Sequence, residues 1–339
     1  MWLEYGLNEA QNLISISEVT RGKTALKCPY CQGELIAKKG KIKVHHFAHA
    51  GETCEPSQNQ NIHLPLFCRF NLVLNNNYLE HFRRIASPDY KCTGLRKERK
   101  IIRYLQEKEI LEHKLFPTLS PLGKAILKQL TLSEFCEAQD KMAQDKLIEL
   151  QNKVVSLERS IKDTIKFQTT DYYQSRPIRY HRKVEKNQRL KEEELKNAKI
   201  DFHLYCIHYR GVLLSHLYFL LIETPSQTLF KIGVTSRDID SRLSEIKIDL
   251  GKIFPDFSIT LLGFWEHRGN LEYYFKYLYE EFNYPLENFT EYFNFSDIEP
   301  IKNSLNSLGY KQLSALEQEV INGNINNYKS SSNNSLNSS

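Results

Sequence analysis

The chain has 339 residues, of which 41% are hydrophobic and 26% charged. This composition excludes a fully disordered protein and predicts two compact units with connecting segments. The first residues lack a basic stretch followed by an apolar run, and no window is apolar enough to span a bilayer, so we expect a cytoplasmic protein with no membrane association. Seven cysteines, two of them in a Cys-x-x-Cys pair, favour reduced thiols and metal ligation over a secreted disulfide framework.

The formal charge is only +5, so its distribution matters more than its total. Residues 176–199 carry nine Lys/Arg against four Glu, and residues 21–43 carry seven against one. Such clusters could bind a polyanion such as DNA. Each cluster taken alone is equally well explained as a solvated lysine-rich surface.

The first region, residues 1–70, holds short strand-like runs, the Cys-x-x-Cys pair and closely spaced histidines. Thiolate and imidazole at these spacings can close a tetrahedral Zn²⁺ site, with the first pair on a tight knuckle. We predict a structural zinc, because a small loop-rich unit needs such a constraint. Five candidates compete for four positions, and His46 either replaces one of the favoured four or orients a ligand. The favoured four are Cys28, Cys31, His49 and Cys54.

This region resembles the N-terminal zinc-ribbon-like part of CoiA-like competence proteins over about residues 20–65. The pattern is Cys28-Pro-Tyr-Cys31, then Leu35-Ile-Ala-Lys-Lys-Gly40, then His46-Phe-Ala-His49 with a trailing Cys54. The family's nuclease core follows an acidic, His-containing segment, whereas residues 57–63 here lack the acid. From this resemblance we therefore expect the zinc module in this chain, but not the nuclease activity of the family.

The middle of the chain is predicted to be helical. Apolar spacing over residues 71–130 indicates helices broken by Pro88, Pro117 and Pro121. A Thr131-Leu-Ser-Glu134 capping box opens a long helix over 131–168. Its apolar residues repeat in a coiled-coil-like seam, which favours packing within the chain and homodimerisation about equally. The seam is Leu147, Leu150, Val154, Leu157 and Ile161.

A basic connector over 169–202 leads to a second compact unit at 203–315, and residues 316–339 are expected to be a flexible Ser/Asn-rich tail. In the second unit, Leu217–Ile222 and Leu229–Val234 are β-prone runs joined by the turn at Thr224-Pro-Ser-Gln. A helix capped by Asp238 follows, then a strand at 258–265, an aromatic amphipathic helix at 271–282 and a last short strand. The predicted fold class is α+β: a zinc-ribbon-like module, a helical middle, and a small antiparallel sheet flanked by helices.

This second unit resembles the GIY-YIG nuclease superfamily over about residues 216–295, particularly the phage-type branch whose second tripeptide is commonly Lys-Ile-Gly. The resemblance implies that Tyr218 matches the tyrosine of the first tripeptide and that Lys231 to Gly233 match the second tripeptide. Arg242 would then match the arginine of the helix, and Glu291 the metal-binding glutamate. Glu272 matches an acidic position on the intervening helix. Lys231 stands where other branches have a second tyrosine, and Lys276 where histidine is common.

These residue types suit phosphodiester hydrolysis, which needs an activated water and neutralisation of growing phosphate charge. Glu291 is expected to hold one Mg²⁺ or Mn²⁺, and Arg242 to offer a planar donor fork to the phosphate. Tyr218, or a water that it positions, is the candidate proton acceptor, provided that metal and cations lower its pKa from about 10. Lys231 is the alternative for that step, and Gly233 lets the backbone approach the scissile group.

Each of these residues also has an ordinary explanation, in strand packing, a turn, a helix-surface pair or an exposed strand position. Their joint occurrence in this order makes a Mg²⁺-dependent DNA endonuclease our first interpretation, in which the zinc module aids DNA or partner binding. A catalytically inactive DNA-binding protein of the same fold is the alternative, because basic clusters and aromatics serve binding equally well. A protein-assembly adaptor is a third possibility.

Overall fold

The computed structural model describes residues 3–10, 13–40, 45–58, 63–72, 74–91, 94–113, 117–286 and 289–323. The chain is α+β, as the sequence predicts. It forms two compact units, each built from two separate stretches of sequence. The first unit is Met1–His63 with Leu147–Cys206, and the second is Leu64–Lys146 with Ile207–Ser339.

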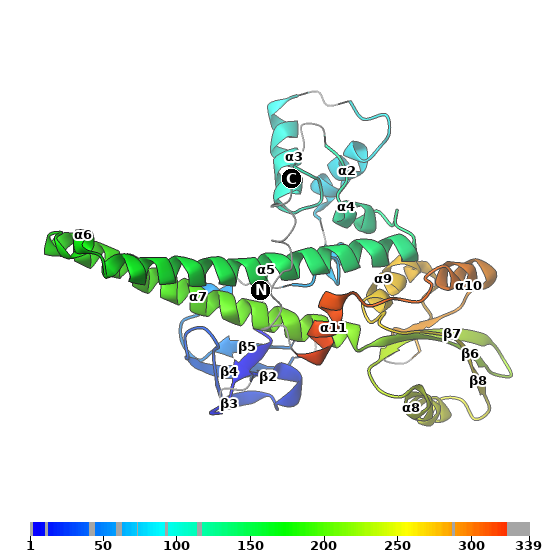
Figure 1. Ribbon diagram of the computed structural model, residues 1–339. Coiled ribbons are helices and arrows are strands. Elements are labelled where there is room, and N and C mark those ends of the chain that lie inside the picture. Colours follow the sequence, from blue (N-terminus) through cyan, green and yellow to red (C-terminus); the bar gives the residue numbers. More distant parts are fainter. Residues whose placement is uncertain are drawn as a thin grey trace, which may run out of the picture. The chain divides into compact units, whose positions relative to one another are not determined.

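The first unit begins with a five-stranded sheet in the order β2-β1-β3-β4-β5 (Figure 1). The strands are antiparallel, and the β4–β5 pairing sets Leu35 opposite His49. A small core that includes Leu26, Leu35 and Phe47 lies on one face. The elements of this part are β1 (Tyr5–Leu7), β2 (Leu13–Ser15), η1 (Ile16–Glu18), β3 (Gly22–Lys27), β4 (Glu34–Lys38), β5 (His46–His49) and α1 (Glu55–Gln58).

The rest of the first unit is a helical hairpin formed by most of α5 (Leu132–Gln168), all of α6 (Asp171–Gln174) and most of α7 (Ile178–Leu213). The two long helices run side by side and are joined at α6 (Figure 1). Ion pairs at Lys153–Glu194 and Glu158–Lys199 connect them. Of the α5 seam, Leu147 and Leu150 are buried in the single chain, which fits packing within the chain, and a homodimer stays a prediction.

The strand module is attached to α7 within this unit. Leu204 belongs to the core of the module, with Ile200 packed against it. Tyr30 donates a hydrogen bond from its hydroxyl to Asp201 at 2.8 Å. The module predicted at residues 1–70 is therefore completed by residues far later in the chain.

The second unit has a helical part and a sheet part. Its helical part contains η2 (Arg69–Asn71), α2 (Asn76–Ile85), α3 (Arg96–Glu107) and α4 (Pro121–Ile126). The predicted prolines lie at interruptions between helices, and Pro121 opens α4 after the N-cap Ser120, whose side chain accepts from Gly123 N–H. The predicted capping box of α5 is confirmed, since Thr131 N–H donates to Glu134 at 2.8 Å and Glu134 N–H to Thr131 at 3.2 Å.

The sheet of the second unit has the strand order β8-β6-β7-β9, entirely antiparallel in its pairings. The predicted hairpin, capped helix and third strand are all present, and Asp238 accepts from Ser241 N–H as the cap of α8. The elements are β6 (His216–Glu223), β7 (Thr228–Thr235), α8 (Ile239–Gly251), β8 (Ser258–Trp265), α9 (Leu271–Leu278), η3 (Glu280–Phe282), β9 (Tyr292–Phe293), α10 (Glu299–Asn306) and α11 (Ala315–Asn322).

Side chains alternate along each strand, and both faces of the central strands β6 and β7 are buried. Leu217 and Phe219 of β6 pack in one core with Phe275 of α9. Tyr218 and Leu220 face the other way, into a second core that also contains residues of α8. The two helices lie on opposite faces of the sheet (Figure 1). The candidate residues Tyr218, Lys231 and Gly233 consequently share the face that α8 covers.

In two segments the structure differs from what the sequence predicted. Residues expected as a basic connector over 169–202 are mainly helical, in α6 and α7. The flexible tail was expected from residue 316, but Ala315–Asn322 forms α11 with a capping box between Ser314 and Glu317. Residues 324–339, which hold most of that tail, lie outside the described residues.

Among the helices of the described ranges, none has both the length and the apolar character needed to cross a bilayer.

Candidate metal centre and C-terminal side-chain cluster

A tight turn between β3 and β4 presents the first two thiols of the metal centre. Cys28 N–H donates to Gly33 O at 2.8 Å, and Gln32 N–H donates to Cys28 O at 2.9 Å. Gly33 N–H points at Cys31 Sγ over 3.4 Å. A side chain on Gly33 would crowd that sulfur, since a Cβ there would lie 3.3 Å from it. The backbone of the knuckle therefore orients Cys31.

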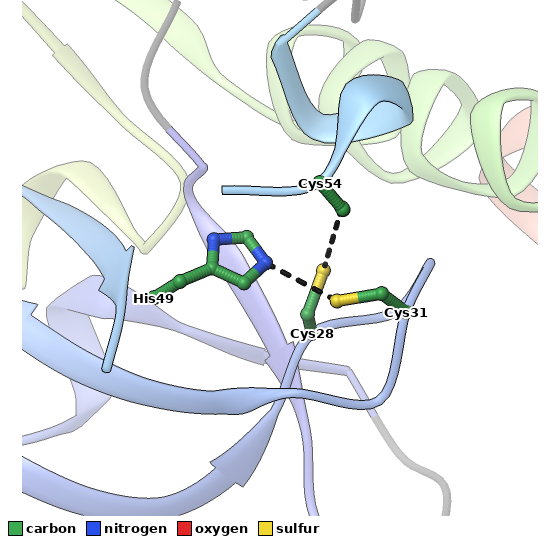
Figure 2. A group of neighbouring side chains, drawn as sticks. All are labelled: Cys28, Cys31, His49 and Cys54. Atoms are coloured by element: carbon green, nitrogen blue, oxygen red, sulfur yellow. Dashed lines mark hydrogen bonds between the residues drawn. The ribbon is translucent and has the colours of Figure 1, made fainter. Parts of the chain in front are cut away.

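The other two donors come from later elements. His49 ends β5, and Cys54 immediately precedes α1. The four donor atoms lie within 4.8 Å of one another, and Figure 2 shows the side chains converging. Cys28 Sγ and Cys54 Sγ are 3.8 Å apart, and Cys31 Sγ is 3.3 Å from His49 Nε2.

These distances fit a tetrahedral metal better than a disulfide. A disulfide bond is about 2.05 Å long. Two thiolates bound to one tetrahedral zinc at about 2.3 Å are separated by about 3.8 Å, which is the Cys28–Cys54 distance. The group can hold a structural metal ion such as zinc, and its four members are the residues that the sequence favoured.

The electrostatics of the cluster also suit a cation. Burial raises the pKa of the Cys28 thiol to about 12, so the thiolate there needs a positive charge beside it. For Cys54, burial raises the pKa, but hydrogen bonds from Ser57 and the neighbouring cysteines outweigh it and lower the pKa overall. Burial lowers the pKa of His49, which favours the neutral ring that binds metals.

His46 is not in this group. It lies three residues before His49 on β5 and is itself buried. Because strand side chains alternate, His46 and His49 point to opposite faces of the sheet. Of the two roles left open for His46, replacement of one of the four ligands does not fit this geometry.

In the second unit, a buried ion pair lies at the centre of the cluster that the sequence predicted. Lys231 is 2% exposed, and its Nζ is 2.9 Å from Glu291 Oε1. The same Nζ lies 4.5 Å from the centre of the Tyr292 ring. Thr290 N–H donates to the other oxygen of Glu291 at 3.0 Å. Tyr292, which sequence reasoning missed, adjoins Glu291 and pairs with Lys231 across β7 and β9.

Tyr218 and Gly233 lie directly opposite each other on β6 and β7. A Cβ on Gly233 would meet the Tyr218 hydroxyl oxygen at 2.3 Å and the ring carbon that bears it at 2.5 Å. The glycine is therefore needed because the phenol ring lies over its backbone. The Tyr218 ring occupies the space over Gly233, and the expected approach of a scissile group to this backbone stays a prediction.

Arg242 joins the cluster from the first turn of α8. Its Nε donates to the Tyr218 hydroxyl oxygen at 3.3 Å, and another guanidinium nitrogen donates to Glu245 at 2.9 Å. Glu245 also accepts two hydrogen bonds from Arg237. The ordinary role of Arg242, as a partner of Glu245, is thus present alongside its contact with Tyr218.

Two charged residues of α9 form a pair whose charges act on this cluster. Lys276 Nζ is 2.6 Å from Glu272. The charge of Glu272 acts on Tyr218 and Lys231, and the charge of Lys276 acts on Glu291. The structure therefore brings Tyr218, Lys231, Arg242 and Glu291 near one another, and Glu272 and Lys276, which the sequence also singled out, pair with each other.

The pKa values of Lys231, Tyr218 and Glu291 shift in different directions, which distinguishes what each group can do. Burial lowers the pKa of Lys231 to about 8, although Glu291 opposes the change. Burial raises the pKa of Tyr218, with Arg242 opposing. For Glu291, burial raises the pKa, but Lys231, Lys276 and the Thr290 N–H together outweigh it and keep the carboxyl ionised. The protein neighbours of Tyr218 thus do not supply the lowered pKa on which its role as proton acceptor was conditional.

The fold and the Cys₃His cluster define the first stretch as a small β module suited to a structural metal ion. Residues 11–57 match the family model described as Competence protein CoiA, N-terminal domain. The match includes all four residues of the cluster and ends before the second site. No curated protein and no solved structure matches the chain.

Proposed function

We propose that the C-terminal sheet is a GIY-YIG-like, Mg²⁺-dependent DNA endonuclease, and that the N-terminal module holds a structural zinc. One observation carries the proposal: Tyr218 and Lys231 share one face of the sheet, where Arg242 contacts Tyr218 and Glu291 pairs with Lys231. Packing alone does not explain two buried or half-buried Lys–Glu pairs beside a buried phenol and a guanidinium.

The residues present fit a magnesium ion bound largely by water and substrate. Mg²⁺ usually takes one or two carboxylates, with water and phosphate oxygens completing an octahedral shell. Glu291 offers an ionised carboxylate that is 21% exposed, and each of its oxygens has a second lone pair besides the one that Lys231 or Thr290 uses. When bound, the ion would neutralise charge on the phosphate.

Arg242 is assigned to the phosphate. Among the described residues, two of the five donors of the Arg242 guanidinium are used, in the hydrogen bonds to Tyr218 and Glu245. The remaining donors can bind phosphate oxygens in the paired geometry that arginine favours. The buried hydroxyl of Tyr218 fixes the orientation of Arg242 through the Nε contact.

Lys231 is assigned to proton transfer in place of Tyr218. With a pKa of about 8, Lys231 is partly neutral near neutral pH and can accept a proton from the attacking water. Tyr218 has a raised pKa and stays protonated, so its hydroxyl serves to position water or phosphate. Of the two candidates that the sequence left open, these pKa directions favour Lys231.

The alternative of a binding protein without hydrolysis also has a specific observation behind it. The Lys231–Glu291 pair at 2.9 Å neutralises the carboxylate that the metal requires. If that pair does not open to a metal, the cluster is a structural ion pair. Cleavage measurements decide between the two functions.

The deciding experiment is a plasmid-nicking assay with added Mg²⁺. The full chain should convert supercoiled to open-circular DNA, and Glu291→Ala should reduce the rate at least about 100-fold, since metal-binding and electrostatic groups contribute on that order. Glu281→Ala is the matched control, because Glu281 is an exposed glutamate of η3 in the same unit. Its rate should equal that of the unmodified protein.

Equal nicking by the unmodified protein and by Glu291→Ala would remove the enzyme proposal. DNA binding without nicking at any Mg²⁺ or Mn²⁺ concentration would favour the binding protein. An adaptor that meets only protein partners should show little salt-dependent DNA affinity.

A further inference from the structure

The tip of the helical hairpin in the first unit is strongly basic. We define the tip as residues 166–191, which hold eight Lys/Arg and only Asp171 and Glu185 as acids. Neither the metal centre nor the proposed nuclease site uses any of these residues.

The tip is an ordered structure with a small aromatic core. Tyr173 is buried, stacks on the His181 ring at 4.4 Å and meets the Phe167 ring edge-on at 5.6 Å. The side chain of Thr170 caps α6, and the Tyr173 carbonyl oxygen lies 2.8 Å from His181 Nε2. The charged residues that follow are therefore carried on a defined helix rather than on a loose loop.

The cations of α7 form a stripe on its outer face. Residues spaced by three, four and seven lie on one side of a helix. We name this set the basic stripe, and all of its members are exposed: Arg179, Arg182, Lys183, Lys186 and Arg189.

The opposite side of α7 is turned to α5. Gln188 accepts a hydrogen bond from Gln168 at 2.8 Å, and Lys191 donates to Ser160 at 2.8 Å. His181 and Val184 on that side are half-buried. Packing against α5 thus fixes the basic stripe outward.

None of the five members of the basic stripe forms an ion pair in the described part of the chain, and Glu185 is the one acid among residues 179–189. Like charges at these spacings each cost a few tenths of a kcal/mol. An arrangement that repels itself in the free protein is compensated when an external polyanion covers it. The stripe spans about 15 Å along α7 at 1.5 Å per residue, which is comparable to the roughly 12 Å width of the DNA major groove.

Next to the stripe, Arg176 lies over the ring of Tyr172 at 4.1 Å and near the ring of Tyr180 at 6.0 Å. Tyr172 is 55% exposed. Ring contacts of this kind hold a guanidinium in place while its edge remains available to a phosphate.

We propose that the basic stripe binds the phosphate backbone of duplex DNA and thereby holds substrate for the proposed nuclease. That the stripe binds a polyanion follows from its charge, and that the polyanion is DNA rests on the proposed function. The contact is with phosphates, so it carries no sequence preference.

The test compares two charge-matched triple variants of the full chain. The tip variant is Arg179→Gln with Arg182→Gln and Lys186→Gln. The control is Lys153→Gln with Lys196→Gln and Lys199→Gln, which removes the same charge from the same hairpin, where Lys153 and Lys199 are already paired with glutamates. Affinity for a fluorescein-labelled duplex is measured by anisotropy across a range of potassium chloride, without added Mg²⁺, so that cleavage does not intervene.

The tip variant should bind at least about tenfold more weakly at low salt, and the slope of log K against log salt should fall by about 3, one unit per lost phosphate contact. The control should keep most of the affinity and of the slope. Unchanged binding by the tip variant, an equal loss in the control, or no duplex binding by the unmodified protein would overturn the proposal.

Two further readouts separate this inference from others. If the tip variant binds duplex normally and still nicks, the basic-stripe proposal is wrong and the nuclease proposal stands. If binding depends on the tip but no nicking occurs, the nuclease proposal is wrong and the basic-stripe proposal stands. If the tip is instead a lipid-binding surface, phosphatidylserine vesicles will sediment with the unmodified protein and not with the tip variant, while duplex affinity is the same for both.

Discussion

At the scale of single residues, Lys231 has the environment with the clearest consequence. It is almost fully buried, next to one carboxylate and over one aromatic ring. Desolvation penalises its charged form more than Glu291 supports it, which lowers its pKa to about 8. The sequence placed a lysine at this strand position but could not show its burial, because burial depends on the packing of α8 and β9.

A lowered lysine pKa predicts a pH-dependent stability. Between about pH 8 and 10.5 the unfolded state binds more protons at this residue than the folded state, so the free energy of unfolding rises with pH in that window. The free energy of unfolding of the unmodified protein minus that of Lys231→Met should rise by about 3 kcal/mol across it. Urea unfolding at a series of pH values measures this difference.

The control for this prediction is Lys252→Met, because Lys252 is exposed and pairs with Asp249 at the surface. Its difference from the unmodified protein should stay flat with pH. A flat difference for Lys231→Met as well would show that Lys231 titrates near its ordinary value.

At the scale of elements, the β6–β7 hairpin positions the site through its register. Tyr218 opposite Gly233 and Leu220 opposite Lys231 set two candidate side chains, Tyr218 and Lys231, on the face that α8 covers. A shift of one residue would move both to the α9 face. The alternating apolar runs and the turn chemistry made this hairpin predictable from sequence.

The Tyr218–Gly233 contact predicts a large effect for a small change. Gly233→Ala places a methyl group against the phenol ring, so it should lower the free energy of unfolding by about 1–3 kcal/mol, as overpacking does. Gly211→Ala is the matched control, because Gly211 lies in α7 with nothing within 4 Å of its Cβ position. It should stabilise the protein by up to about 1 kcal/mol. Equal effects in thermal or urea unfolding would contradict the close contact.

The sequence did not predict the α7 helix, because polar residues form its interface with α5. The α7 residues turned to α5 include His181, Gln188 and Lys191, so an apolar period is absent and the segment looked like a connector. At the other end of the chain, the capping box of Ser314 and Glu317 was a signal for α11 that the Ser/Asn-rich composition obscured. The metal ligands were predictable because cysteine and histidine spacing is a local property.

At the scale of the whole molecule, the two units should respond differently to loss of metal. The four-residue cluster lies in the first unit only. Cys31→Ser should lower the native mass by one zinc ion and speed amide exchange in β3, β4 and β5, while β6 to β8 keep their protection, because a structural zinc supplies folding free energy to its own module. Native mass spectrometry and hydrogen exchange measure both effects.

Cys68→Ser is the control, since Cys68 lies in the second unit and outside the cluster. It should retain the zinc and the exchange pattern. An unchanged zinc content in Cys31→Ser would contradict the ligand set.

The attachment of the strand module to α7 also affects how the protein is made. Tyr30 meets Asp201, 171 residues later, and Leu204 completes a core that begins at Leu3. A ribosome that adds about 5–20 residues per second therefore releases the first strands well before their helical support exists. During that interval the nascent module has its metal ligands but lacks part of its apolar cover, so early zinc capture would protect it from aggregation on the ribosome.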